Sequence, residues 1–305
     1  MGLREIPEIK YSKDIERLVK IYSRSYTSVV KELIRLLEND APLTYVNQQA
    51  SIARQISLIL KHNDEVIQNE VEKLLTDSFV KGQAQALLSL GEASSLAEAT
   101  KQVSGSLLAK QTIDKVLQDT YEDVLALTSR TDKRIKQTIR EVAGQILRNN
   151  AIQGLTYDTN RKEVMEKLLK KGFSKTVKDN FKGVTDSAGR KWELKRYVNM
   201  MVKTKMSQAY TEGVRAECID RGIDLAVISS HGARDACRQF EGMVISMTGA
   251  TSGYYTLDEL RASNKIFHPH CKHTVTPLSS IDLLPASVRE KHEEKLKNAK
   301  NNKLI

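Results

Sequence analysis

Proline is absent from residues 43–268 of this 305-residue chain, and its absence constrains the fold more than any other feature. Proline lacks a backbone N–H and breaks helix interiors, so a run of 226 residues without it permits long helices. Three of the five prolines, Pro269, Pro277 and Pro285, lie in the last 37 residues. We therefore expect a helical body followed by a C-terminal part of a different kind.

Apolar residues recur every three or four positions through most of this body, which is the spacing of an amphipathic helix. The strongest example starts at Leu194 and keeps the spacing for about six turns before Gly222. The polar segment 172–191 contains three glycines, so we expect a loop and a candidate domain boundary there. The same spacing predicts further helices at 12–38, 44–61, 64–88, 107–128, 132–149 and 157–171, with a loop or short helix at 89–106.

The pattern changes after Gly222. Residues 223–230 and 244–247 are short β-branched runs, and 274–276 is a third strand candidate. Thr256 and Glu259 have the spacing of a capping box that opens a short helix. The fold class is therefore mainly α with a small α+β C-terminal head, in which long helices lead into a short-stranded module containing Cys and His. We expect a helical region at 1–190, a domain at 191–288 made of the long helix and this module, and a charged tail at 289–305 that frays.

Whole-chain composition excludes several classes of protein. Apolar content of 40% and charged content of 28% are ordinary for a folded chain and exclude wholesale disorder. Three cysteines are too few for a disulfide framework. The chain shows neither a signal-peptide core nor an apolar run long enough to cross a bilayer. We expect no membrane partner, and synthesis in a reducing cytosol.

The net charge of +10 is concentrated in one segment. Residues 161–205 contain 14 Lys and Arg against 5 Asp and Glu, whereas 1–160 contain 21 of each sign and 206–305 contain 13 and 12. Such a local excess fits a polyanion surface that contacts DNA phosphates without reading sequence. A solvated helix face is the alternative. The candidate DNA contacts are Lys167, Lys170, Lys171, Lys175, Lys178, Lys182, Arg190, Lys191, Lys195 and Arg196.

Cysteine and histidine gather in two short segments, 231–237 and 268–273. Zinc takes three or four N and S ligands in a tetrahedron, usually from two separate segments. The predicted ligands of one structural zinc are Cys237, Cys271 and His273, with His231 or His268 as the fourth.

Other interpretations of these residues stay open. They are a Cys237–Cys271 disulfide, ordinary packing of unligated side chains, and a catalytic site using Asp235, His231 or His270. The chain has no Walker loop, nucleophile elbow or His-Glu-x-x-His pattern. We therefore expect a protein that is not an enzyme; a metal-dependent nuclease or other hydrolase acting on nucleic acid is the alternative. Cys218, on the long helix, is expected to be a small core side chain.

Three stretches, 192–217, 229–237 and 266–273, resemble the Mu F-like head-morphogenesis family, minor capsid proteins of tailed bacteriophages. The family pattern is Asp-x-Cys followed by His-Pro-x-Cys-x-Cys. Asp235 and Cys237 match its first part, His268 and Cys271 match its second, and His273 stands where a cysteine is expected. That exchange keeps a zinc ligand but cannot keep a disulfide partner.

The resemblance implies a role and a place. It implies a minor head protein associated with the portal inside the capsid, present in the host cytoplasm during assembly. Its expected partners are portal and capsid proteins and the packaged DNA. It would contribute to head assembly and to DNA packaging or ejection.

Overall fold

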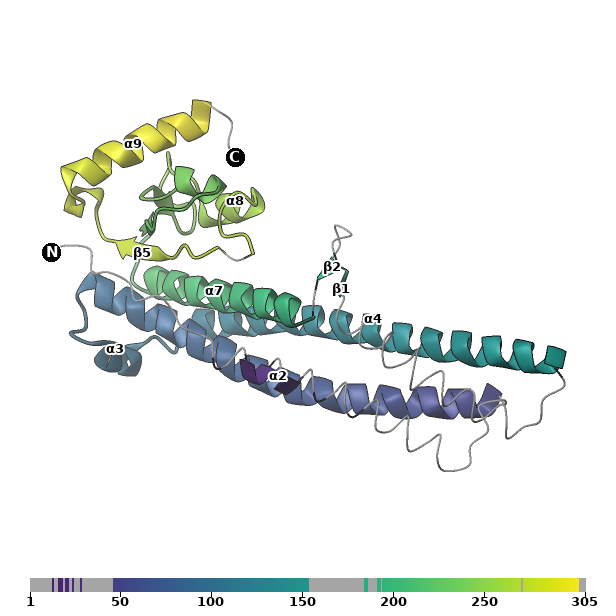
Figure 1. Ribbon diagram of the computed structural model, residues 1–305. Coiled ribbons are helices and arrows are strands. Elements are labelled where there is room, and N and C mark those ends of the chain that lie inside the picture. Colours follow the sequence, from purple (N-terminus) through teal and green to yellow (C-terminus); the bar gives the residue numbers. More distant parts are fainter. Residues whose placement is uncertain are drawn as a thin grey trace. The chain divides into compact units, whose positions relative to one another are not determined.

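The computed structural model describes residues 46–153, 184–185, 191–192, 194–269 and 271–301, with a few single positions between 13 and 28 (Figure 1). Helices dominate these residues, and a three-stranded antiparallel sheet lies near the C-terminus, which confirms the expected fold class. No helix in this part of the chain is long and apolar enough to cross a membrane. The helices are α2 (Val46–Leu90), α3 (Leu96–Gln102), α4 (Leu107–Gln153), α7 (Leu194–Asp220), α8 (Leu257–Ala262) and α9 (Ala286–Asn301).

Two pairs of predicted helices are each one helix. The segments 44–61 and 64–88 are joined in α2, and 107–128 and 132–149 are joined in α4. Neither junction contains Gly or Pro, so no residue there has a strong reason to end the helix.

The connections between helices partly differ from expectation. The stretch 89–106 contains the short helix α3, whose N-cap Ser95 accepts a hydrogen bond from the Glu98 N–H. In and directly after the predicted loop 172–191, two short strands pair antiparallel, β1 (Val184–Thr185) and β2 (Lys191–Trp192). The predicted helix 157–171 lies outside the described residues, and 12–38 is described only at 13, 16–18, 20–21, 24 and 28, all of them helical.

The chain divides into two compact units. Unit 2 contains residues 12–70 and 120–199. In it, Thr128 of α4 donates a hydrogen bond to Asp64 of α2 (2.6 Å), and Ser57 of α2 donates one to Asp132 of α4 (3.1 Å). These polar contacts tie α2 to α4. The apolar side chains buried in this unit include Ile56, Leu60, Ile67, Val124 and Leu127.

Unit 1 contains residues 71–119 and the described residues from 200 to 301. Here α2 and α7 cross with their backbones in contact. A Cβ atom added to Gly82 would lie 2.0 Å from the Tyr210 carbonyl oxygen, and one added to Gly213 would lie 2.0 Å from that of Phe79. Only glycine permits this approach on either helix.

Buried Glu217 of α7 fastens the same crossing. Its carboxylate accepts hydrogen bonds from the Gln83 side chain on α2 (2.8 Å) and from the Ser104 N–H before α4 (3.2 Å). Arg221, the first residue after the end of α7, forms an ion pair with it. A buried carboxylate is retained because each of these donors offsets its lost hydration.

Three strands form the sheet of the C-terminal module (residues 225–301). The strands are β3 (Leu225–Ile228), β4 (Val244–Ser246) and β5 (Val275–Leu278), and the order β4-β3-β5 places β3 in the centre. Pro277 is tolerated because β5 is an edge strand. The sheet packs on a core whose buried members include Tyr210, Val214, Phe240, Met243, Ile245, Leu260 and Val275.

The expected fraying tail is mostly the helix α9. Its Ala299 is buried in the module core, and the buried Nδ1 of His292 accepts a hydrogen bond from the Val244 N–H (3.0 Å). Lys295 donates to the main-chain carbonyls of Arg238 and Glu241. Charged composition suggested a solvated tail, but these contacts hold the helix on the module.

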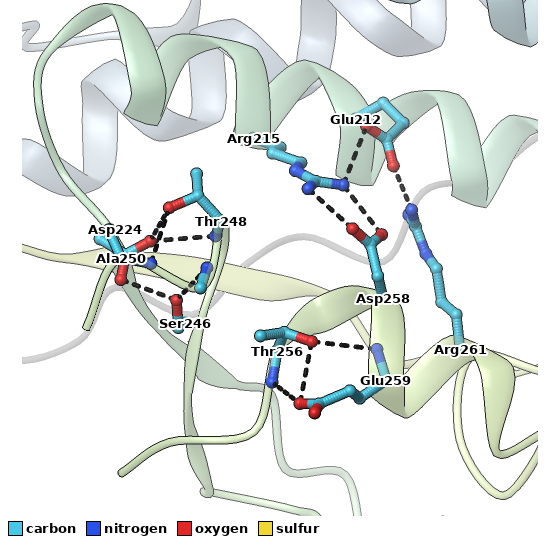
Figure 2. Close-up of polar contacts among 11 residues, drawn as sticks. Glu212, Arg215, Asp224, Ser246, Thr248, Ala250, Thr256, Asp258, Glu259 and Arg261 are labelled. Atoms are coloured by element: carbon cyan, nitrogen blue, oxygen red, sulfur yellow. Dashed lines mark hydrogen bonds and ion pairs between the residues drawn. The ribbon is translucent and has the colours of Figure 1, made fainter. Parts of the chain in front are cut away.

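Charged side chains connect α8 to α7 (Figure 2). Arg215 of α7 donates two hydrogen bonds of 2.9 Å to the Asp258 carboxylate of α8, and Arg261 of α8 pairs with Glu212 of α7. The predicted capping box is confirmed: the Thr256 hydroxyl accepts from the N–H of the residue three positions on, whose own carboxylate accepts from the Thr256 N–H.

Candidate metal centre

The two Cys- and His-containing segments meet because their strands are neighbours. One segment follows the end of β3, and the other precedes the start of β5, its antiparallel partner. Ser229 and Thr274 join them, since the Ser229 N–H donates to the Thr274 carbonyl (2.9 Å) and the Thr274 N–H donates to the Ser229 hydroxyl (3.0 Å). The ends of two paired strands thus place residues more than 30 positions apart at one point.

A short helical turn aims Cys237 into the module. Asp235 is the N-cap of a 3₁₀ turn at Ala236–Gln239, and its carboxylate accepts a hydrogen bond from the Cys237 N–H (3.1 Å). Cys237 is only 1% exposed. In the other segment the Cys271 N–H donates to the His268 carbonyl (2.9 Å), which closes a turn before β5.

Four of the predicted ligands form a chain of close contacts. Cys237 Sγ lies 3.0 Å from His268 Nε2 and 3.7 Å from Cys271 Sγ, and Cys271 Sγ lies 3.2 Å from His273 Nδ1. The ligand atoms of Cys237, Cys271 and His273 all lie within 4.8 Å of one another.

The distances among Cys237, Cys271 and His273 are compatible with three corners of a zinc tetrahedron. His268 groups instead with Cys237 and Asp235 and would have to move to complete it. Zn–S bonds of about 2.3 Å and Zn–N bonds of about 2.0–2.1 Å give S···S edges of about 3.8 Å and S···N edges of about 3.5 Å. The sulfur pair already has the required separation. The imidazole nitrogens of His268 and His273 are a few tenths of an ångström too close to the sulfurs and would have to move outward.

The two candidates for the fourth ligand have different surroundings. His268 contacts the Cys237 sulfur and lies 3.5 Å from an Asp235 carboxylate oxygen. The His231 ring instead packs on the His273 ring, with centroids 4.2 Å apart. Of the two, His268 is therefore the one placed against a predicted sulfur ligand. His270 lies outside the described residues.

All three cysteines are free thiols. The Cys237–Cys271 separation of 3.7 Å far exceeds a disulfide bond of about 2.05 Å. Burial and the neighbouring Cys271 raise the pKa of Cys237, so its thiol is protonated at neutral pH. Cys218 is fully buried in the module core as expected, and burial raises its pKa to about 12.

Sequence reasoning missed Glu241. Its carboxylate oxygen Oε1 accepts hydrogen bonds from the N–H groups of His231 and Ala233 (2.9 Å each) and lies 3.3 Å from His273 Nε2. Burial opposes its ionisation, but the two N–H donors and His273 outweigh that cost and hold the pKa of Glu241 at about 2. No spacing rule marks this residue, because its contact with His273 spans 32 positions.

The predicted DNA contacts fall mostly outside the described residues, which include none of the candidates between Lys167 and Arg190. Lys191 lies in β2, and Lys195 and Arg196 lie in the first turn of α7, where Arg196 is exposed. The basic segment stays a prediction.

Comparison with known families gives a match. A family model described as phage minor capsid protein 2 matches residues 8–304. This confirms the resemblance to phage minor capsid proteins and extends it from the C-terminal motifs to almost the whole chain. No curated protein and no solved structure matches the chain significantly.

Proposed function

The chain belongs to the phage minor capsid protein 2 family, and on that basis we propose that it acts inside the phage head, at the portal. There it contributes to head assembly and to DNA packaging or ejection, and it catalyses no reaction. Its partners are portal and capsid proteins and the packaged DNA. Family membership is consistent with head morphogenesis. The location at the portal and the part in DNA packaging or ejection are proposed in addition.

The Cys and His cluster supports a structural role for the C-terminal module. In this proposal one zinc is held by Cys237, Cys271 and His273, with His268 as the fourth ligand. Cys237 and His273 are each 1% exposed, Cys271 is half-buried, and the His268 side chain is 25% exposed. A catalytic zinc keeps one position open to water or substrate. The burial of Cys237 and His273 is the observation that carries the proposal of a structural metal centre.

Such a zinc would stabilise a module with few strands. The ligands come from the segment after β3 and the segment before β5, which leave the sheet at the same end of this strand pair, so the metal would join two loops that the sheet holds only at one end. A small domain with a limited core gains most from such a link. Because the unfolded chain has no preformed site, the binding free energy adds to the stability of the folded module.

Metal analysis tests the centre. Protein prepared without chelator is expected to contain about one zinc per chain, and Cys271→Ala is expected to lose it. Cys218→Ala is the matched control, because it removes a buried thiol of the same module outside the cluster. Metal-free wild-type protein, or full zinc retention in Cys271→Ala, would contradict the proposal.

A nuclease assay tests the absence of catalysis. Purified protein incubated with DNA and Mg²⁺, Mn²⁺ or Zn²⁺ is expected to leave the DNA intact. Metal-dependent cleavage that disappears in His268→Ala would replace the structural proposal with a hydrolase.

The basic segment 161–205 is proposed to contact packaged DNA through phosphates. Reversing the charge at Lys170, Lys171, Lys175 and Lys178 is expected to weaken DNA binding and to reduce the salt slope by about 0.9 per lost phosphate contact. The same change at four exposed lysines of the neutral region is the control: Lys61, Lys73, Lys101 and Lys110. Equal effects in both variants would refute a dedicated surface, and density for the chain in an assembled head would test its position.

A further inference from the structure

Glu241 lies against the nitrogen of His273 that does not face the thiols. We propose that Glu241 is a positioning residue that makes Nδ1 of His273, and not Nε2, the metal ligand. The inference rests on the proposed zinc centre and concerns how its most buried histidine is oriented.

The His273 ring is contacted at both nitrogens. Nδ1 lies 3.2 Å from the Cys271 sulfur, and Nε2 lies 3.3 Å from the Glu241 carboxylate. An ionised carboxylate can only accept a hydrogen bond, so Nε2 carries the ring proton and Nδ1 keeps its lone pair toward the sulfurs. Histidine ligands of metals commonly donate their other N–H to a carboxylate, which fixes the ring and makes the ligand more basic.

Glu241 is itself fixed from two sides. Its carboxylate accepts the N–H groups of His231 and Ala233, in the loop that leads to Cys237. Its main-chain carbonyl accepts a hydrogen bond of 2.6 Å from Lys295 of α9. One side chain therefore links the loop of one ligand to the ring of another, and the ring is oriented before a metal binds.

A second cation site is the alternative use of Glu241 and His273. His231, Glu241 and His273 also group within 4.8 Å and could hold a cation of their own. A cation there would need the lone pair of His273 Nε2, whereas the proposal leaves Nε2 protonated toward Glu241, so the two uses require opposite tautomers of the ring.

Zinc competition against a chromophoric chelator tests the proposal. Glu241→Ala is expected to lower zinc affinity by about 10- to 100-fold. Glu241→Gln is expected to lose less, because the amide oxygen still accepts from the loop and from Nε2–H without the negative charge. Glu259→Gln is the matched control, because Glu259 is an exposed carboxylate in the α8 capping box. Unchanged affinity in both Glu241 variants would show that Glu241 only braces its loop.

Long-range ¹H–¹⁵N NMR of zinc-loaded wild-type protein gives a second readout. The proposal predicts a protonated Nε2 and a metal-shifted Nδ1 on His273. Metal coordination through Nε2 would overturn it, even if a variant fails to fold. Wild-type protein that binds no zinc would refute the centre itself, whereas zinc binding with unchanged variants and Nε2 coordination would refute only the role of Glu241.

Discussion

Adding one methyl group at the crossing of α2 and α7 is expected to destabilise unit 1. In Gly213→Ala the new Cβ would lie 2.0 Å from the Phe79 carbonyl oxygen, about 1 Å closer than such atoms approach in practice. The obstacle is main chain and cannot rotate away, so the helices must move apart along the contact. Overpacking of this kind costs about 1–3 kcal/mol.

Helix propensity works in the opposite direction. Alanine is favoured over glycine by about 1 kcal/mol in a helix interior, which offsets part of the clash. Because separating the helices also strains the Gln83–Glu217 hydrogen bond, we expect a net loss of about 1–2 kcal/mol in the free energy of unfolding. Gly82→Ala, which meets the Tyr210 carbonyl at the same distance, is expected to behave alike.

The double variant provides the sharper test. Once the helices have separated for one methyl group, much of the space for the second is present. The loss of unfolding free energy in the double variant should therefore be smaller than the sum of the losses in the two single variants. Urea unfolding followed by circular dichroism measures all three variants. Gly105→Ala is the control, since a Cβ there meets no atom within 4 Å. Stabilisation by either single change, or strict additivity, would refute the backbone contact.

Three further predictions concern the C-terminal module. Burial lowers the pKa of His292, whose Nδ1 accepts the Val244 N–H. As the pH falls, the unfolded chain therefore takes up a proton at this histidine before the folded chain does. The free energy of unfolding, measured in the presence of a chelator, is expected to fall below about pH 6.5 in wild-type protein and to fall less in His292→Gln. A fall of equal size in His292→Gln would show that other titrating groups cause the pH dependence of stability. Asp258→Asn removes the charge paired with Arg215 and is expected to cost about 0.5–1 kcal/mol in urea unfolding, against almost nothing for the exposed Asp77→Asn. EDTA is expected to lower the melting temperature of wild-type protein, because zinc at 100 times its Kd stabilises the folded state by about 2.7 kcal/mol. The melting temperature of Cys271→Ala is expected to stay the same in EDTA. An equal shift in both proteins would contradict the zinc centre.

Local signals predicted local structure well. The capping box at Thr256 was found from two residues three apart, because its hydrogen bonds close within one turn. The proline-free run predicted long helices. The apolar spacing did not show that α2 continues from 61 to 64, or that α4 continues from 128 to 132. The charged composition of α9 hid its two buried residues, His292 and Ala299, because two buried positions in 16 residues leave little periodic pattern.

Tertiary contacts were beyond the reach of spacing rules. Cys237, Cys271 and His273 were recognisable because zinc ligands are rare residue types that cluster in short segments. Glu241 is an ordinary residue type, and only the pairing of β3 with both β4 and β5 brings it to His273. Likewise, Gly213 in a helical pattern predicts a small loss of helix propensity, and its contact with α2 exists only in the fold.

Unit 1 is discontinuous along the chain, and this sets when it can form during synthesis. The Gln83–Glu217 hydrogen bond joins residues 134 positions apart. At a translation rate of about 5–20 residues per second, α2 waits roughly 7–27 s for the helix that covers it. A nascent chain released before residue 220 would carry an uncovered glycine-containing face on α2, so shortened forms of this protein should aggregate or be degraded instead of folding a smaller version of unit 1.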